Sequence, residues 1–174
     1  NQGEVQGMLE RGAMELTGAT SLQAAWQAIL VGYQAGDRVA MKINNNNDWS
    51  DDQGTLNTDP EIIVAIVAGL KTIGVPESDI YVYDVSRSSL PRQLDGVRSL
   101  YPSVRFVNNG NVSWDSQPLS GSFGSVRVPT VLTQADHLIN LHMMKMHSLS
   151  GAGITGALKN HLGSTSNPSA FHDN

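Results

Sequence analysis

Short apolar runs alternate with amphipathic stretches along this chain of 174 residues, and this alternation constrains the fold more than any other feature. The clearest amphipathic stretch begins at Pro60, with Thr58 or Asp59 as its capping residue. Its apolar residues recur at helical spacing: Ile62, Ile63, Ile66, Val67 and Leu70. Strand-like runs at 38–43 and 80–84 lie on either side of it. The sequence therefore predicts an α/β fold of three layers, with a mostly parallel sheet flanked by helices.

The rest of the chain continues this alternation. We expect further helices at 4–16, 21–31, 89–100, 129–135 and 154–162, further strands at 104–107 and 136–141, and a long loop or hairpin at 108–125. A chain of this length is expected to fold as one α/β domain, residues 1–174, and to bury roughly 68–70% of its unfolded surface. It begins with Asn1 rather than methionine, which indicates a processed or trimmed start.

Charge and cysteine content exclude several classes of protein. The net charge is −5 and the sequence pI is about 5.4, so the basic footprint of a nucleic-acid-binding protein is missing. The chain has no cysteine, which excludes an iron–sulfur cluster held by cysteines of this chain. No apolar run reaches the roughly 18–20 residues that a membrane span requires. Small-molecule binding and protein assembly remain as the expected functions.

The segment 139–161 is the most chemically dense part of the chain, with two lysines and three histidines around a glycine-rich turn. It follows a predicted strand, and ligands of parallel sheets bind where strands end. Lys145 and His147 alternate, so both side chains point the same way if the backbone is extended. A lysine beside a histidine suits an electrostatic stabiliser with a base, or an anion clamp with a metal ligand.

The glycine-rich turn at 151–156 matches the spacing of a dinucleotide-binding loop, but it does not directly follow the strand. An anion held by backbone N–H groups is the more general interpretation. In the helix predicted after the turn, Thr155 and Lys159 share a face and are expected to address the same oxyanion. His161 falls on an apolar stripe with Leu158 and Leu162, which predicts a hydrogen-bonded core histidine rather than a ligand.

The end of the strand at 38–43 supplies two further candidates. Lys42 and Asn44 alternate and are both expected to project from this end. An unpaired charge is costly to bury, so a lysine within an apolar strand is either paired or functional. Asn44 is expected to contribute to a site, with a role in a turn as the alternative.

Several motifs together resemble the uncharacterised family known as domain of unknown function 362. The resemblance covers about residues 37 to 172 and is most specific at Lys145-Met146-His147 and at 155–160. Its other motifs are Lys42-Ile43-Asn44, Thr58 with Pro60, and the segment 135–141. His142 and Met143 depart from the proline and lysine usual in the family.

The resemblance implies an α/β fold but no established activity. Some members carry ferredoxin-type modules and some are exported with twin-arginine signals, so an exported or periplasmic location is an expectation for this bacterial-type chain. Members normally continue beyond the last histidine region, which suggests a fragment of a longer domain. The site residues that the resemblance implies are Asn44, Thr58, Lys145, His147, Thr155, Lys159, Asn160 and His172.

These observations predict an enzyme of unknown reaction that binds a small anionic substrate, with a divalent metal as the expected cofactor. Lys145, His147 and Lys159 are the catalytic candidates, and His147 and His172 are the metal-ligand candidates. The ligand-binding candidates are Lys42, Asn44, Thr58, Thr155 and Asn160. Two alternatives stay open: a non-catalytic anion-binding module, and a scaffold subunit that packs against copies of itself or a second chain.

Overall fold

The computed structural model describes residues 1–45, 57–146 and 154–171, with the backbone alone at 145–146 and 154–155. Its centre is a four-stranded sheet in the order β3-β2-β1-β6. The strands are β1 (Val39–Lys42), β2 (Ile80–Tyr83), β3 (Arg105–Val107) and β6 (His137–Asn140). All three neighbouring pairs are parallel, which confirms the predicted α/β fold.

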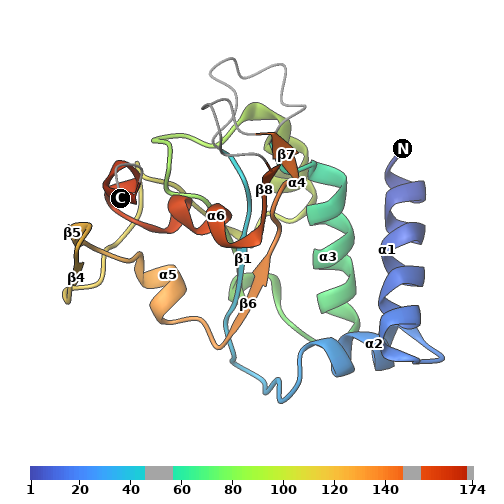
Figure 1. The fold of residues 1–174 in the computed structure, drawn as a ribbon. Helices are drawn as coiled ribbons and strands as arrows, with labels where there is room; N and C mark the ends of the chain where they lie inside the picture. The colour runs from blue at the N-terminus through green and yellow to red at the C-terminus, as the bar shows by residue number, and fades with distance from the viewer. Residues whose placement is uncertain (46–56, 147–153, 172–174) are drawn as a thin grey trace.

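Helices cover this sheet on two sides (Figure 1). On one side α3 (Pro60–Thr72) packs against the strands, and α1 (Gln2–Thr17) and α2 (Leu22–Ile29) pack against α3. The short helices α5 (Thr130–Thr133) and α6 (Ala157–Asn160) lie on the other side. The predicted helices and strands up to residue 83 are thus present, with ends that differ by one or two residues. No helix within the described ranges is long and apolar enough to cross a membrane.

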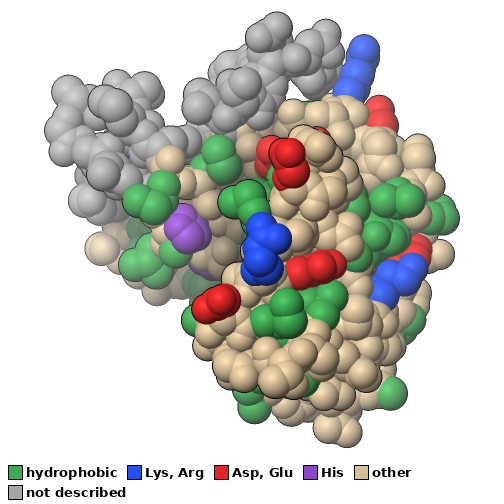
Figure 2. Space-filling model, turned by 90° about the vertical axis from the view of Figure 1, so that its right-hand side faces the viewer, with side chains coloured by type: hydrophobic (Ala, Val, Ile, Leu, Met, Phe, Trp, Pro, Cys, Tyr) green, Lys and Arg blue, Asp and Glu red, His purple; other side chains and the backbone are tan. Residues whose placement is uncertain are grey.

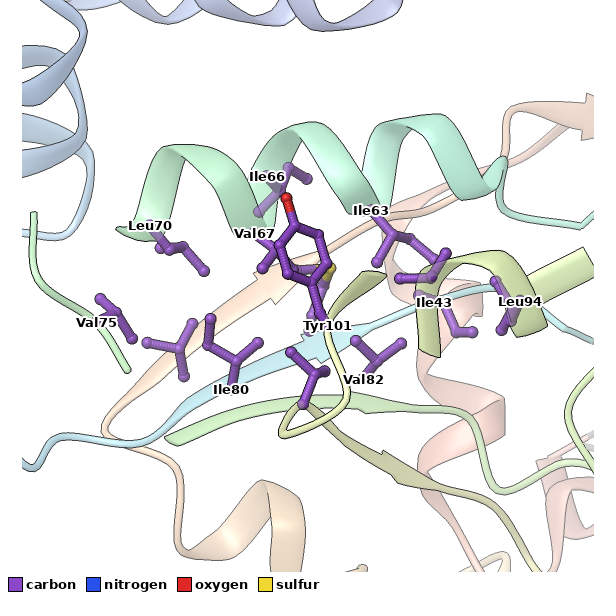
Figure 3. Close-up of a cluster of buried hydrophobic side chains, with 14 of the residues drawn as sticks. Ile43, Ile63, Ile66, Val67, Leu70, Val75, Ile80, Val82, Leu94 and Tyr101 are labelled. Carbon is purple, nitrogen blue, oxygen red and sulfur yellow. The ribbon is translucent and has the colours of Figure 1, made fainter. Parts of the chain in front are cut away.

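The main apolar core lies between α3 and the sheet (Figure 3). Alternate strand residues such as Met41 and Val82 point to this side and are fully buried. From α3, Ile63 and Leu70 meet them and are also fully buried. Each such side chain contributes roughly 1.5–3 kcal/mol when it leaves water. This packing leaves the other alternate residues, Lys42 among them, on the second face of the sheet.

Asp59 is the residue that caps α3. Its side chain accepts a hydrogen bond from the backbone N–H of Glu61, and Pro60 occupies the first turn. Thr58 has a different role, because its hydroxyl accepts from the backbone N–H of Asn44 at 2.7 Å. The helix ends at Ile73 and Gly74, where Gly74 adopts φ 88°.

The second half of the chain differs from the prediction in two places. The helix predicted at 89–100 begins only after Pro91, as the 3₁₀ turn η2 (Arg92–Leu94) followed by α4 (Asp95–Leu100). The helix predicted at 154–162 is wrong at its start. Ile154–Thr155 form β8, which pairs antiparallel with β7 (Lys145–Met146). Leu158 is 90% exposed, so the apolar stripe predicted for this segment is also wrong.

The remaining elements are short. The loop or hairpin predicted at 108–125 corresponds to a segment with the antiparallel pair β4 (Leu119–Gly121) and β5 (Gly124–Val126), which ends one residue later than predicted. The other 3₁₀ turns are η1 (Glu77–Asp79), η3 (His161–Ser164) and η4 (Pro168–Phe171). The turn η3 continues α6 and brings residues 161–164 against the end of β2, where the backbone N–H of Val85 donates to the carbonyl of Gly163 at 2.9 Å.

Candidate functional site

Polar side chains from distant parts of the chain meet at the carboxyl ends of the parallel strands. We call this group the carboxyl-edge cluster; its members are Lys42, Asn44, Asp84, Asn140 and Asn160. Lys42 ends β1, Asp84 follows β2, Asn140 ends β6 and Asn160 ends α6. Strand ends of a parallel sheet share one edge, and this is where such folds place ligands.

A buried ion pair lies at the centre of the cluster. Lys42 Nζ lies 2.9 Å from Asp84 Oδ2, and the two side chains are 0% and 2% exposed. The ammonium also donates to the carbonyl of Ile43 and to Asn160 Oδ1, the latter at 3.3 Å. Burial lowers the pKa of Lys42, and the nearby charge of Asp84 opposes that change. Three acceptors thus satisfy the three N–H groups of the ammonium.

The carboxylate of Asp84 is equally well satisfied. Its Oδ2 accepts from the backbone N–H of Asn45 at 2.9 Å as well as from Lys42. Its Oδ1 accepts from the backbone N–H of Ser86 at 2.9 Å and from the hydroxyl of Ser86 at 2.5 Å. Gly163 packs directly against it, since a Cβ at that position would lie 2.5 Å from Asp84 Oδ1. The carboxylate therefore fixes the end of β2, the start of the loop after β1, and η3.

Asn160 joins three elements through one amide group. Its Oδ1 accepts from Asn44 Nδ2 at 3.2 Å and from Lys42 Nζ. Its Nδ2 donates to the backbone carbonyl of Lys42 at 3.3 Å and to Asn140 Oδ1 at 2.7 Å. Asn140 in turn donates to the carbonyl of Ala157 at 3.0 Å. The side chain of Asn160 is nearly fully buried and holds α6 against the ends of β1 and β6.

Thr58 anchors the segment that leaves β1. Its hydroxyl accepts from the backbone N–H of Asn44 and lies 3.3 Å from the carbonyl of Leu141, to which it donates. Its own backbone N–H donates to the carbonyl of Asn44 at 2.9 Å. Thr58 is buried, so its polar groups are used within the protein and hold the chain at the cluster.

A second chain of hydrogen bonds lies beside the cluster. His161 Nδ1 is 3.2 Å from Ser164 Oγ, which is 3.1 Å from the hydroxyl of Tyr83. Burial raises the pKa of Tyr83 to about 12. Burial first, and then the charge of Lys42, lowers the pKa of His161. His161 is thus hydrogen-bonded, half-buried and favoured in its neutral form.

The other predicted site residues differ in how close they lie to the carboxyl-edge cluster. Lys145 and Thr155 are partners in the backbone register of β7 and β8. Lys159 precedes Asn160 on α6 and is half-buried. His147 and His172 lie outside the described residues. Asn44, Thr58 and Asn160 are in direct contact with one another or with Lys42, although 116 residues separate Asn44 from Asn160.

Asp84 is the main residue that the sequence prediction did not assign to the site. The available signal was its position directly after a predicted strand, together with a lysine buried in the neighbouring strand. Gly163 and Ser164 were also missed. The sequence predicted a helix as far as residue 162, and the turn of η3 that brings Gly163 to Asp84 has no pattern of its own.

The described residues do not form a metal site by themselves. Within 1–45, 57–146 and 154–171, no three His, Cys, Asp or Glu side chains are grouped to hold a metal ion. Asp84 is the carboxylate of the cluster, and its two oxygens already accept four hydrogen bonds from Lys42, Asn45 and Ser86. The predicted metal therefore depends on His147 and His172.

The parallel sheet and its buried polar edge define an α/β protein with a candidate site at the carboxyl ends of the strands. The family model for a domain of unknown function, DUF362, matches residues 39–174. The chain belongs to this family, as the sequence motifs indicated. Neither the curated proteins nor the solved structures include a significant match to the chain.

Proposed function

We propose that this protein binds a small anionic ligand at the carboxyl edge of its sheet and acts on it as an enzyme. The observation that carries the proposal is the buried network of Lys42, Asp84 and Asn160, which fixes the ends of β1, β2, β6 and α6 relative to one another. Buried polar networks with every partner satisfied rigidify the elements that they join. A rigid frame is what a preorganised site requires.

In this proposal the cluster positions the site, and its neighbours contact the ligand. Lys42 is fully buried and paired, so its role is to hold Asp84 and Asn160 in place. Lys145, Thr155 and Lys159 would contact the anion, with Asn44 as an additional donor. The backbone pairing of Lys145 with Thr155, and the position of Lys159 next to Asn160, support this assignment.

His147 would act as the general base or as a metal ligand together with His172. It lies two residues after Lys145, close in the chain to the proposed anion contacts. An imidazole side chain can accept a proton or bind a metal ion, which suits either role. The proposed divalent metal depends on these two histidines.

The test is ligand-dependent thermal stabilisation combined with metal analysis. A series of small anions, from inorganic phosphate to short dicarboxylates, is titrated against the protein at constant ionic strength. Lys159→Gln is expected to weaken the stabilisation, whereas Lys71→Gln, which changes a lysine on α3 that pairs with Glu77, should not. Equal responses from both variants would reject a specific anion site.

Metal analysis separates catalysis from simple binding. Protein purified without chelator is expected to carry a stoichiometric divalent metal that is lost in His147→Ala. If anions stabilise the protein and no metal is present in the wild type, the non-catalytic anion-binding module becomes the better description.

An apolar groove on the side of α1 favours assembly as a second candidate function. It has a volume of about 550 Å³ and is lined by residues of α1, α2 and α3, among them Leu9, Trp26 and Ile62. Met8 and Leu16 border it and are 66% and 81% exposed. On this side of the molecule hydrophobic side chains are interspersed with charged ones (Figure 2). Light scattering tests the candidate, because a strict monomer at high concentration removes it.

A further inference from the structure

A polar cavity lies away from the carboxyl-edge cluster, near the amino ends of the strands. Its volume is about 340 Å³. Arg38 directly precedes β1, Arg105 begins β3, and Tyr81 lies between them on β2. The other lining residues are Phe106, Val107, Asn111, Ser113, Thr130, Val131 and Gln134. We call this the two-arginine cavity.

The backbone register places both arginines on the second face of the sheet. Tyr81 pairs with Ala40 and with Arg105, so the three residues share a level and a face. Arg38 lies two residues before Ala40 and points to the same face if the strand alternation continues. The Cα atoms of the two arginines are then roughly 12 Å apart, which two side chains of this length can span. Lys42 is four residues further along β1, about 13 Å from Arg38.

Neither guanidinium has a carboxylate partner within the described part of the chain. Arg38 Nη1 donates to Gln134 Oε1 at 2.7 Å. Asp136 accepts from the backbone N–H of Arg38 rather than from its side chain. The guanidinium of Arg105 lies over the ring of Tyr81, 5.3 Å from its centroid. By contrast, Arg98 pairs with Asp95 at 2.7 Å on the protein surface.

The charged side chains that line the cavity are all positive. The lining contains two permanent positive charges and no carboxylate. Asn111 uses its amide within its own loop, since its Oδ1 accepts from Asn108 and its Nδ2 donates to the carbonyl of Phe106. Gln134 uses its oxygen for Arg38, which leaves its amide N–H groups as further donors. On a chain with a net charge of −5, this concentration of donors favours an anion.

We propose that the two-arginine cavity binds a small molecule through a carboxylate or phosphate group. A planar guanidinium donates two parallel N–H bonds to either group. The cation–π contact with Tyr81 holds the Arg105 guanidinium over the ring without using its N–H groups. The volume is at the lower end for a small-molecule site, so the ligand has one oxyanion group and a compact body. This site is distinct from the proposed anion site at the carboxyl edge.

The proposal is tested by calorimetric titration with phenyl phosphate, benzoate and inorganic phosphate at constant ionic strength. Saturable binding of at least one probe is expected in the wild type. Arg38→Gln and Arg105→Gln should each weaken it about tenfold or more, because each removes charge-assisted hydrogen bonds. The matched control Arg11→Gln removes an exposed arginine of α1, which lies on the other side of the sheet and does not line the cavity, and should bind normally.

The same titration on Lys159→Gln separates the two proposed sites. Unchanged affinity in this variant, with loss in the two arginine variants, assigns the binding to the two-arginine cavity. Preference for phenyl phosphate or for benzoate identifies the ligand group. The proposal is overturned if no probe binds saturably, if the arginine variants bind like the wild type, or if Arg11→Gln weakens binding as much as they do. Circular dichroism spectra confirm that each variant is folded.

Discussion

Lys42 and Asp84 show how a charged pair can be kept inside an α/β core. Both groups have left water, which costs several kcal/mol per ion, and this cost is offset only if the remaining polar atoms also find partners. Here the ammonium has three acceptors and the carboxylate has four donors. Loss of either member would therefore leave several buried polar groups without partners, in addition to breaking the 2.9 Å ion pair.

Asp84→Ala is expected to destabilise the protein by about 3–5 kcal/mol, because it leaves the ammonium of Lys42 buried without a counter-charge. Urea denaturation measures the effect. The control Asp95→Ala breaks an ion pair with Arg98 that is exposed to solvent and should change stability little. The double variant Lys42→Met, Asp84→Leu should be more stable than Asp84→Ala, and an equal or lower stability would contradict the assignment.

The raised pKa of the buried Tyr83 predicts that the protein loses stability at alkaline pH. This pKa rises from 10.0 to about 12 on burial, so above pH 10 the unfolded state releases a proton that the folded state retains. The contribution is fully present below pH 10 and is lost as the pH approaches 12, in total about 3 kcal/mol. Denaturation curves of the wild type and Tyr83→Phe across this range provide the measurement, and the variant should lack this component. Parallel curves for the two proteins would refute it.

At the scale of elements, two glycines determine how closely helices and turns approach. Gly69 of α3 lies under the indole of Trp26 from α2, where a Cβ would come within 2.0 Å of Trp26 Nε1. Gly163 likewise lies against Asp84, where a Cβ would come within 2.5 Å of Asp84 Oδ1. At neither position can the neighbour withdraw without loss, because Trp26 is part of the core and Asp84 holds Lys42.

Gly163→Ala is expected to destabilise the protein by about 1–3 kcal/mol through overpacking against Asp84. Gly96→Ala in α4 is the matched control, since a Cβ there meets nothing within 4 Å and alanine favours a helix. Thermal denaturation should show a lower Tm for the first variant and an unchanged or higher Tm for the second. If both variants shifted in the same direction by the same amount, the contact with Asp84 would be unimportant.

Elements with long apolar patterns could be predicted from the sequence, and contacts between distant residues could not. The repeat from Ile62 to Leu70 fixed α3 and its buried face, and the runs at 38–43 and 80–84 identified β1 and β2. A pair as short as β7 and β8 has no periodicity to detect, so Ile154 was assigned to a helix. For Lys42, the pattern showed that a partner or a function was needed, but the partner is 42 residues away at Asp84.

At the scale of the whole molecule, the apolar core extends beyond the residues that the family model matches. The match covers residues 39–174, whereas the core also includes Trp26 and Leu30, which precede it. Both are 4% exposed, and α1 and α2 together cover the outer side of α3. The first two helices therefore belong to the folded unit, although they lie outside the matched residues.

Removal of residues 1–30 is expected to lower the free energy of unfolding by more than the 3–5 kcal/mol typical of losing one buried tryptophan. The measurement is urea denaturation of the shortened chain beside the full chain. Leu16→Gln, which changes a residue of α1 that is 81% exposed, serves as the control and should unfold like the wild type. A shortened chain as stable as the full chain would show that these helices are dispensable.

The amide of Asn160 also has a consequence for the chemical ageing of the protein. Hydrolytic loss of ammonia would turn its Nδ2, which donates to the carbonyl of Lys42 and to Asn140, into an oxygen that faces two other oxygens. The new acid would also add a negative charge beside Asp84 and Lys42. A single spontaneous deamidation at this position would thus loosen three secondary-structure elements at once.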